Sequence, residues 1–229
     1  MAAPSSSSKR HSILPAVSQA GPKPPIQFSS SLVIADSAIL TGPHTITIRS
    51  ESVIHPRARL ESTAGRINIG RRCIVHERTH IGLVPSSSSS SSRNGKSSLV
   101  SKGSGLGVLG EAGEAPVSPS VLIGAVTLGD YVTVEVAVTI EGGETLIGDG
   151  TIVGVGSKIG AGATVGKHCT LTPHSVVAPG EVIPDFTVIY SNGARRKDRR
   201  GVVDLRNKGQ ARQIEVLRRM IPSNPAKFQ

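Results

Sequence analysis

The chain has 229 residues and a formal net charge of +10, with 37% hydrophobic but only 2% aromatic residues. Because it has no tryptophan, its core must be built from aliphatic side chains in thin, regular layers. No run of about 18 apolar residues and no N-terminal apolar h-region occurs, which argues against a membrane span or a signal peptide. Two cysteines, Cys73 and Cys169, are too few for a disulfide framework. We therefore expect a cytoplasmic protein with buried, reduced thiols.

Residues 1–27 are rich in serine and proline and cannot bury enough apolar surface to order themselves. They are expected to form a disordered tail. From residue 28 onward, aliphatic residues recur about every six positions. Weak rungs at Val33 and Ile39 precede clearer ones at Ile48, Val53 or Ile54, Leu60, Ile69, Val75 and Ile81. A nine-residue step around Gly65 replaces one step of six.

Residues 85–119 interrupt the pattern with a run of serines, Ser86 to Ser92, followed by glycine-rich sequence. Such low complexity is typical of a long flexible loop that leaves one corner of the repeat. A functional lid is the less favoured interpretation.

The second half of the chain contains the clearest ladder. After Leu128, Val134 and Ile140 and one extra residue, aliphatics stand six apart at Ile147, Val153, Ile159, Val165, Leu171, Val177, Ile183 and Ile189. Four positions after each rung the residue is small in all but one hexad, and Cys73 and Cys169 both fall on such small sites. Glycine directly follows the first four of these eight rungs, which indicates either a positive φ or a close approach of two backbones.

A period of six fits neither an α-helix nor a simple β-hairpin. It fits one side of a triangular coil, in which three hexads make a turn of about eighteen residues and each short strand pairs with its equivalent in the next coil. The fold class predicted for residues 28–190 is therefore all-β, a left-handed parallel β-helix of six or seven coils. The handedness rests on precedent for glycine-rich hexads.

Residues 191–229 are different, with eleven Lys and Arg against three acidic residues, whereas the stretch from Val121 to Tyr190 is acidic. A basic linker comes first. A helix follows from Lys208 to Ile221, with Ile214, Leu217 and Ile221 on one face and Pro222 at its end. We expect this helix to pack as a cap on the open last coil.

The linker contains Arg195, Arg196, Arg199 and Arg200. A solvated charge run and a docking site for an acidic partner are both compatible with it. Binding of nucleic acid is not expected, because aromatic residues for base stacking are nearly absent.

Hexad β-helices also occur in acyltransferases and γ-class carbonic anhydrases. At the position expected for the second zinc histidine of the anhydrases the chain has Val134 to Ala137, and His76 and His80 are interpreted as corner residues facing solvent. An acyltransferase would need one histidine as general base and a cleft between trimer subunits. His168 and His174 could stack on one outer face and offer such a base, although a surface role is favoured for them.

The segments from Ser52 to Leu60, from Ile67 to Gly70 and from Glu181 to Tyr190, together with the terminal helix that ends at proline, resemble the small pointed-end hexapeptide-repeat subunits of dynactin. This resemblance implies a non-enzymatic scaffold subunit in the cytoplasm and cytoskeleton that supports dynein-driven transport. Its partners would be a related β-helix subunit, actin-related proteins and, indirectly, adaptors or cargo. No catalytic residue, cofactor, metal or membrane insertion is then expected, and the candidate interface or cap consists of Ile214, Leu217, Ile221, Arg195, Arg196, Arg199 and Arg200. The alternative is a trimeric hexapeptide-repeat enzyme, either an acyltransferase or a carbonic-anhydrase-like protein.

Overall fold

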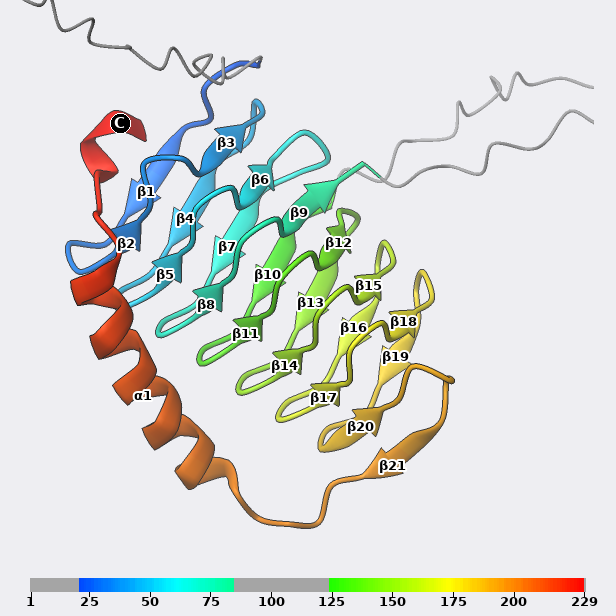
Figure 1. Cartoon of the computed structure of the whole chain (residues 1–229). Coiled ribbons are helices and arrows are strands. Elements are labelled where there is room, and N and C mark those ends of the chain that lie inside the picture. The colour runs from blue at the N-terminus through cyan, green and yellow to red at the C-terminus, as the bar shows by residue number, and fades with distance from the viewer. Residues whose placement is uncertain (1–20, 85–123, 229) are drawn as a thin grey trace, which may run out of the picture.

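A computed structural model describes residues 21–84 and 124–228. These residues form a parallel β-helix with three sides, and one α-helix lies along it (Figure 1). The first sheet contains β1 (Ile26–Phe28), β4 (Ile46–Ile48), β7 (Ile67–Ile69), β10 (Val126–Leu128), β13 (Thr145–Ile147), β16 (Thr164–Val165) and β19 (Val182–Ile183). The second contains β2 (Val33–Ile34), β5 (Val53–Ile54), β8 (Ile74–Val75), β11 (Thr133–Val134), β14 (Ile152–Val153), β17 (Thr170–Leu171), β20 (Thr187–Ile189) and β21 (Arg195–Lys197). The third contains β3 (Ile39–Thr41), β6 (Arg59–Glu61), β9 (His80–Leu83), β12 (Thr139–Glu141), β15 (Lys158–Ile159) and β18 (Val176–Val177).

The strand pairing confirms the predicted solenoid with its C-terminal helix. Successive strands of each sheet pair in parallel, and among the described strands only β21 runs antiparallel, beside β20. Six coils are complete and a seventh has two sides, β19 and β20. Residues 1–20 of the predicted tail lie outside the described residues, and the predicted end of the tail at residue 27 is wrong, because Ile26 and Gln27 belong to β1. The predicted loop at 85–119 also lies outside the described residues. The chain leaves the third sheet at β9 and returns at β10, the next strand in sequence order.

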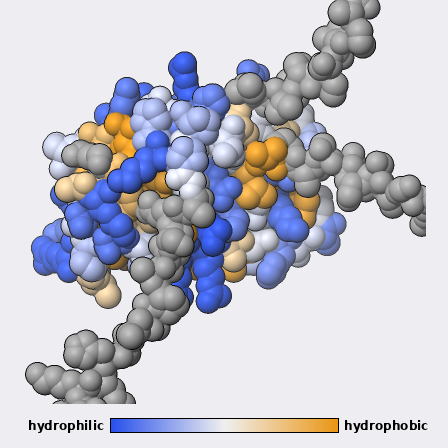
Figure 2. Space-filling model, turned by 90° about the horizontal axis from the view of Figure 1, so that it is seen from above, coloured by the Kyte–Doolittle hydropathy of each residue, from blue (hydrophilic) through white to orange (hydrophobic). Residues whose placement is uncertain are grey.

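The hexad ladder forms the core. All eight aliphatics from Ile147 to Ile189 are at most 1% exposed, and each contributes about 1.5–3 kcal/mol relative to exposure. The small sites hold both cysteines, as predicted, and several hydroxyls. Ser52 shows how a hydroxyl is accommodated: it donates to the carbonyl of Gly70 at 2.8 Å and accepts the amide of Cys73 at 3.1 Å. The inner surface is therefore apolar, and Figure 2 shows hydrophobic residues only in separated patches on the face in view.

In the first coil the predicted frame is wrong by one residue. Ile34 and Leu40, and not Val33 and Ile39, point into the core. Val33 points outward but is only 5% exposed, because the outer face of the strand is also covered, by a second apolar cluster that includes Ile214. Two apolar neighbours in a two-residue strand leave the inward frame ambiguous, which explains the error.

The glycines after the rungs serve close backbone approach. A Cβ on Gly148 would lie 2.7 Å from the carbonyl carbon of Gly166, and a Cβ on Gly166 would lie 2.6 Å from the amide nitrogen of Asp185. Neither glycine has a positive φ. The coils at this corner are stacked so closely that a side chain would push them apart.

The helix α1 (Val203–Met220) runs back along the outer face of the second sheet (Figure 1). Ile214 is 3% exposed and packs on Val33, Val53 and Ile74, with Leu217 and Ile221 beside it. The expectation that this helix caps the last coil is therefore wrong. It covers the outward side chains of the first three coils because these are apolar, while equivalent positions further along include Thr133 and Thr170.

The ends of the solenoid are closed by other segments. At the last coil, β21 pairs with β20 through Val188 opposite Arg196, so the segment predicted as a linker contains an edge strand. At the first coil, the 3-10 helix η1 (Pro225–Phe228) inserts Phe228 into the core, where it is 5% exposed. Within the described residues, no helix is long and apolar enough to cross a membrane.

Candidate functional site

Two histidines and a carboxylate form a column at the corner that follows the second sheet. His55, His76 and Glu135 each come directly after a strand, β5, β8 and β11 respectively, so coil stacking places them one above another. Hydrogen bonds hold this register, from the amide of His55 to the carbonyl of Val75 and from the amide of His76 to the carbonyl of Val134, both at 2.9 Å. The ring centroids of His55 and His76 lie 4.4 Å apart.

The environment keeps both imidazoles neutral. Burial and, to a smaller extent, the neighbouring His76 together lower the pKa of His55 to about 4. Burial also lowers the pKa of His76, whereas the carboxylates of Glu135 and Glu77 act in the opposite direction. The Nε2 atom of His55 is the one buried side-chain nitrogen or oxygen of the described residues without a hydrogen-bond partner. A neutral imidazole can accept a proton, and of the two rings His76 is the one suited to this role, because the Nε2 atom of His55 is buried.

The other histidines named from the sequence do not join this column. His80 lies on β9 in the third sheet. His168 stacks on Phe186 at 5.2 Å between ring centroids, at the corner between the first and second sheets, whereas His174 is exposed at the next corner. The expected stack of His168 on His174 is wrong, because a step of six residues moves one side around the coil. His76 is half-buried, not a solvent-facing residue.

No metal centre accompanies the histidine column. Within residues 21–84 and 124–228, no group of three or more His, Cys, Asp or Glu side chains could hold a metal ion. The two thiols are equally unsuited to chemistry, since burial raises the pKa of Cys73 to about 12 and also raises that of Cys169.

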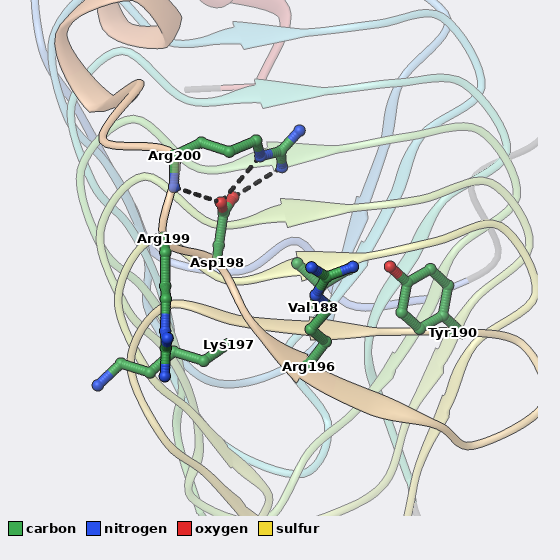
Figure 3. Close-up of a pocket in the computed structure, with 7 residues that line it drawn as sticks. All are labelled: Val188, Tyr190, Arg196, Lys197, Asp198, Arg199 and Arg200. Carbon is green, nitrogen blue, oxygen red and sulfur yellow. Dashed lines mark hydrogen bonds and ion pairs between the residues drawn. The ribbon is translucent and has the colours of Figure 1, made fainter.

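A second feature is a hollow of about 560 Å³ at the last coil, which we call the basic hollow. It is lined by Val188, Tyr190, Arg196, Lys197, Asp198, Arg199 and Arg200 (Figure 3). The tight turn after Tyr190 returns the chain as β21, which brings the basic residues beside the outer face of β20. Three of the arginines named from the sequence, Arg196, Arg199 and Arg200, thus line one hollow, whereas Arg195 pairs with Glu181 outside it.

The carboxylate in the basic hollow is already engaged. Asp198 binds Arg200 at 2.7 Å and Arg206 of α1 at 3.2 Å, and its side chain is 7% exposed. The Arg200 hydrogen bonds hold the pKa of Asp198 far below its usual range. Asp198 therefore remains charged and fixes the start of α1 against the last coil.

The apolar residues of the predicted interface are placed elsewhere. Ile214, Leu217 and Ile221 lie against the first three coils, so they contact this chain itself and not the last coil. Sequence reasoning missed the histidine column. The signal was a spacing of 21 residues between His55 and His76, which is one coil of eighteen plus the three extra residues of the step around Gly65.

The family model for six repeats of the bacterial transferase hexapeptide matches residues 144–179. Among solved structures, a hexapeptide transferase family protein from Anaplasma phagocytophilum is similar at 15% identity and a TM-score of 0.60, with 85% of this chain and 91% of that chain covered. A putative acetyltransferase from Bacillus cereus is similar at 19% identity and a TM-score of 0.61, with the same coverage. A comparison with curated proteins gives no match.

These findings contradict the predicted dynactin subunit. The matching model and the structural neighbours carry the names of transferases, and no dynactin subunit is among them. The predicted dynactin and actin-related partners, the role in dynein-driven transport and the predicted absence of enzymatic activity are corrected with it. The hexads and the closing strand that suggested dynactin are properties of the solenoid. At sequence identities of 15% and 19%, the structural similarity shows a shared hexapeptide-repeat fold but not a shared activity.

Proposed function

We propose that this chain is an acyltransferase of the hexapeptide-repeat type, which moves an acyl group from a thioester to a hydroxyl or amine. The observation that carries this proposal is the column of His55, His76 and Glu135, in which two neutral imidazoles lie together beside a carboxylate. The names of the two structural neighbours support the same class of reaction. A carbonic-anhydrase-like activity has no comparable support, since the described residues contain no suitable cluster of metal ligands.

In this proposal His76 is the general base. The imidazole accepts the proton of the acceptor's O–H or N–H, and the freed lone pair attacks the thioester carbonyl carbon. The resulting tetrahedral intermediate collapses as the C–S bond breaks, and the imidazolium returns its proton to the leaving thiolate. Glu135 and Glu77 favour the protonated form of His76 that exists between these two steps. His55 lies against His76, with 4.4 Å between the ring centroids, and holds that imidazole in position.

The direct test is release of free thiol from acetyl-CoA by the full chain, measured with a thiol reagent against a panel of amines and sugar hydroxyls. We expect His76→Gln to lower the turnover number by about 10²-fold or more, the usual contribution of a general base. His174→Asn is the matched control, because His174 is an exposed histidine at the same kind of corner and asparagine tolerates its φ of 60°. Equal activity of His76→Gln and the control would refute the assignment of the base.

The proposal includes a homotrimer in the cytoplasm. A cleft between subunits would supply the remaining walls of the site, and both buried thiols would remain reduced there. The mass in solution from light scattering tests the trimer, and cell fractionation tests the location. A chain that stays monomeric at micromolar concentration and releases no thiol with any acceptor would rule out the proposed enzyme.

A further inference from the structure

The basic hollow at the last coil holds more positive charge than the chain itself neutralises. Of its basic residues, only Arg200 forms an ion pair among the described residues. Arg196, Lys197 and Arg199 are exposed and have no carboxylate partner there. Three unpaired cations of the described residues therefore line the hollow.

The single acidic residue of the basic hollow does not cancel this charge. Asp198 is bound by Arg200 and Arg206, and that second arginine comes from α1. These contacts hold the segment between β21 and α1 in place. The hollow is therefore a built feature whose walls come from β20, β21 and the segment that leads to the helix.

The remaining lining indicates the kind of anion. Val188 is 9% exposed and lies on the outer face of β20, and Tyr190 is 38% exposed. The hollow of about 560 Å³ is of the size that small ligands occupy. Cations next to an aromatic ring suit a phosphorylated ligand with a flat base, because guanidinium groups bind phosphate oxygens and a ring can stack on a base.

We propose that the basic hollow binds the diphosphate group of a nucleotide, with Arg196 and Arg199 as the principal phosphate-binding residues and Tyr190 as the surface for the base. This goes beyond the proposed function, because a diphosphate can bind there whether or not acyl transfer occurs. The nucleotide is either free or the nucleotide part of an acyl donor such as coenzyme A. An acidic protein segment is the less favoured occupant, since the charge lines a concave hollow of small-molecule size.

The test is calorimetric titration of the full chain with ADP, coenzyme A and inorganic pyrophosphate at fixed salt. We expect ADP to bind with a submillimolar Kd, and Arg196→Gln and Arg199→Gln each to weaken it about tenfold, the loss of one charge-assisted contact. Arg212→Gln is the control, since it removes an exposed cation of α1 that does not line the hollow and should leave the Kd unchanged. Thermal unfolding of each variant shows that the fold is retained.

Two further measurements separate the parts of the proposal. Tyr190→Leu should weaken ADP while pyrophosphate binding stays the same. Tighter binding of coenzyme A than of ADP, abolished by the same arginine variants, identifies an acyl donor as the source of the diphosphate, whereas equal affinities identify a free nucleotide. No binding of ADP up to millimolar concentration, equal binding by Arg196→Gln and Arg199→Gln, or tighter binding of a polyglutamate peptide than of ADP would overturn the proposal.

Discussion

The imidazole rings of His55 and His76 lie 4.4 Å apart, centroid to centroid, on consecutive coils. The pair is partly shielded from water, and the burial that keeps His55 neutral has a cost when the pH falls. In the folded chain the pKa of His55 is about 4, below its unfolded value of 6.5. The unfolded chain therefore binds a proton over a pH range in which the folded chain does not.

From this we predict that the free energy of unfolding is constant above about pH 6.5 and falls between pH 6.5 and pH 4. Partial solvent screening limits the loss from this residue to about 1–2 kcal/mol. Urea titrations at a series of pH values measure it. His55→Gln should make the slope in this range smaller, with a part left that comes from His76, whose pKa burial also lowers. His174→Asn should keep the wild-type slope. An unchanged slope in His55→Gln would show that other groups cause it.

The cysteines lead to a second prediction. Cys73 and Cys169 are fully buried in the small sites of the coils, and burial raises the pKa of both thiols. Because the thiolate is the reactive form, neither should react with a neutral thiol reagent in the native chain, and both should react once it is unfolded. Counting labelled thiols by mass spectrometry at increasing urea checks this. Rapid labelling of either thiol without denaturant would contradict the packing.

The hexad period predicted the solenoid and its core because inward side chains must recur once per side of the coil. It left the first coil uncertain, where Val33 and Ile34 are both apolar. Two adjacent apolar residues in one strand indicate that both faces of the strand are buried. The strands β2, β5 and β8 are apolar on both faces because α1 covers the outer face. Double apolar pairs in three successive coils, followed by Thr133 and Val134, could have placed the helix on the first coils.

The candidate site was less accessible from the sequence. Stacking depends on position around the coil, so residues 21 apart can meet while His168 and His174, six apart, lie at different corners. The role of β21 was hidden for another reason. Arginine and lysine in a row are typical of a solvated segment, and only the hydrogen bonds offered by the free edge of β20 make a strand of Arg195–Lys197.

The helix gives a third prediction. Ile214 is 3% exposed against Val33, Val53 and Ile74, so Ile214→Asp would place a charge in an apolar contact. We expect a loss of about 2–4 kcal/mol in the free energy of unfolding. Val216→Asp is the control, because Val216 is 55% exposed on the same helix and should change stability by less than about 0.5 kcal/mol. Similar losses in the two variants would mean that α1 is sensitive to charge in general and does not dock through Ile214.

The C-terminal segment gives the last prediction, which concerns the first coil. Ser223 forms an isolated antiparallel β-bridge with Ala35, and its hydroxyl accepts a hydrogen bond from the amide of Ile34 at 3.0 Å. Phe228 then fills the open end of the core. The ion pair of Lys227 with Asp36 at 3.3 Å is exposed and adds little.

Phe228→Ala should therefore lower the free energy of unfolding by about 2–3 kcal/mol, whereas Lys227→Ala should lower it by less than about 1 kcal/mol. Hydrogen exchange shows where the loss falls. Because Phe228 covers one end only, amides of β4 and β5 in the second coil should exchange faster in Phe228→Ala, while those of β16 and β17 should keep their protection. Faster exchange at both ends would mean that the solenoid opens as one unit, and unchanged exchange in β4 and β5 would mean that Phe228 does not cover the core in solution.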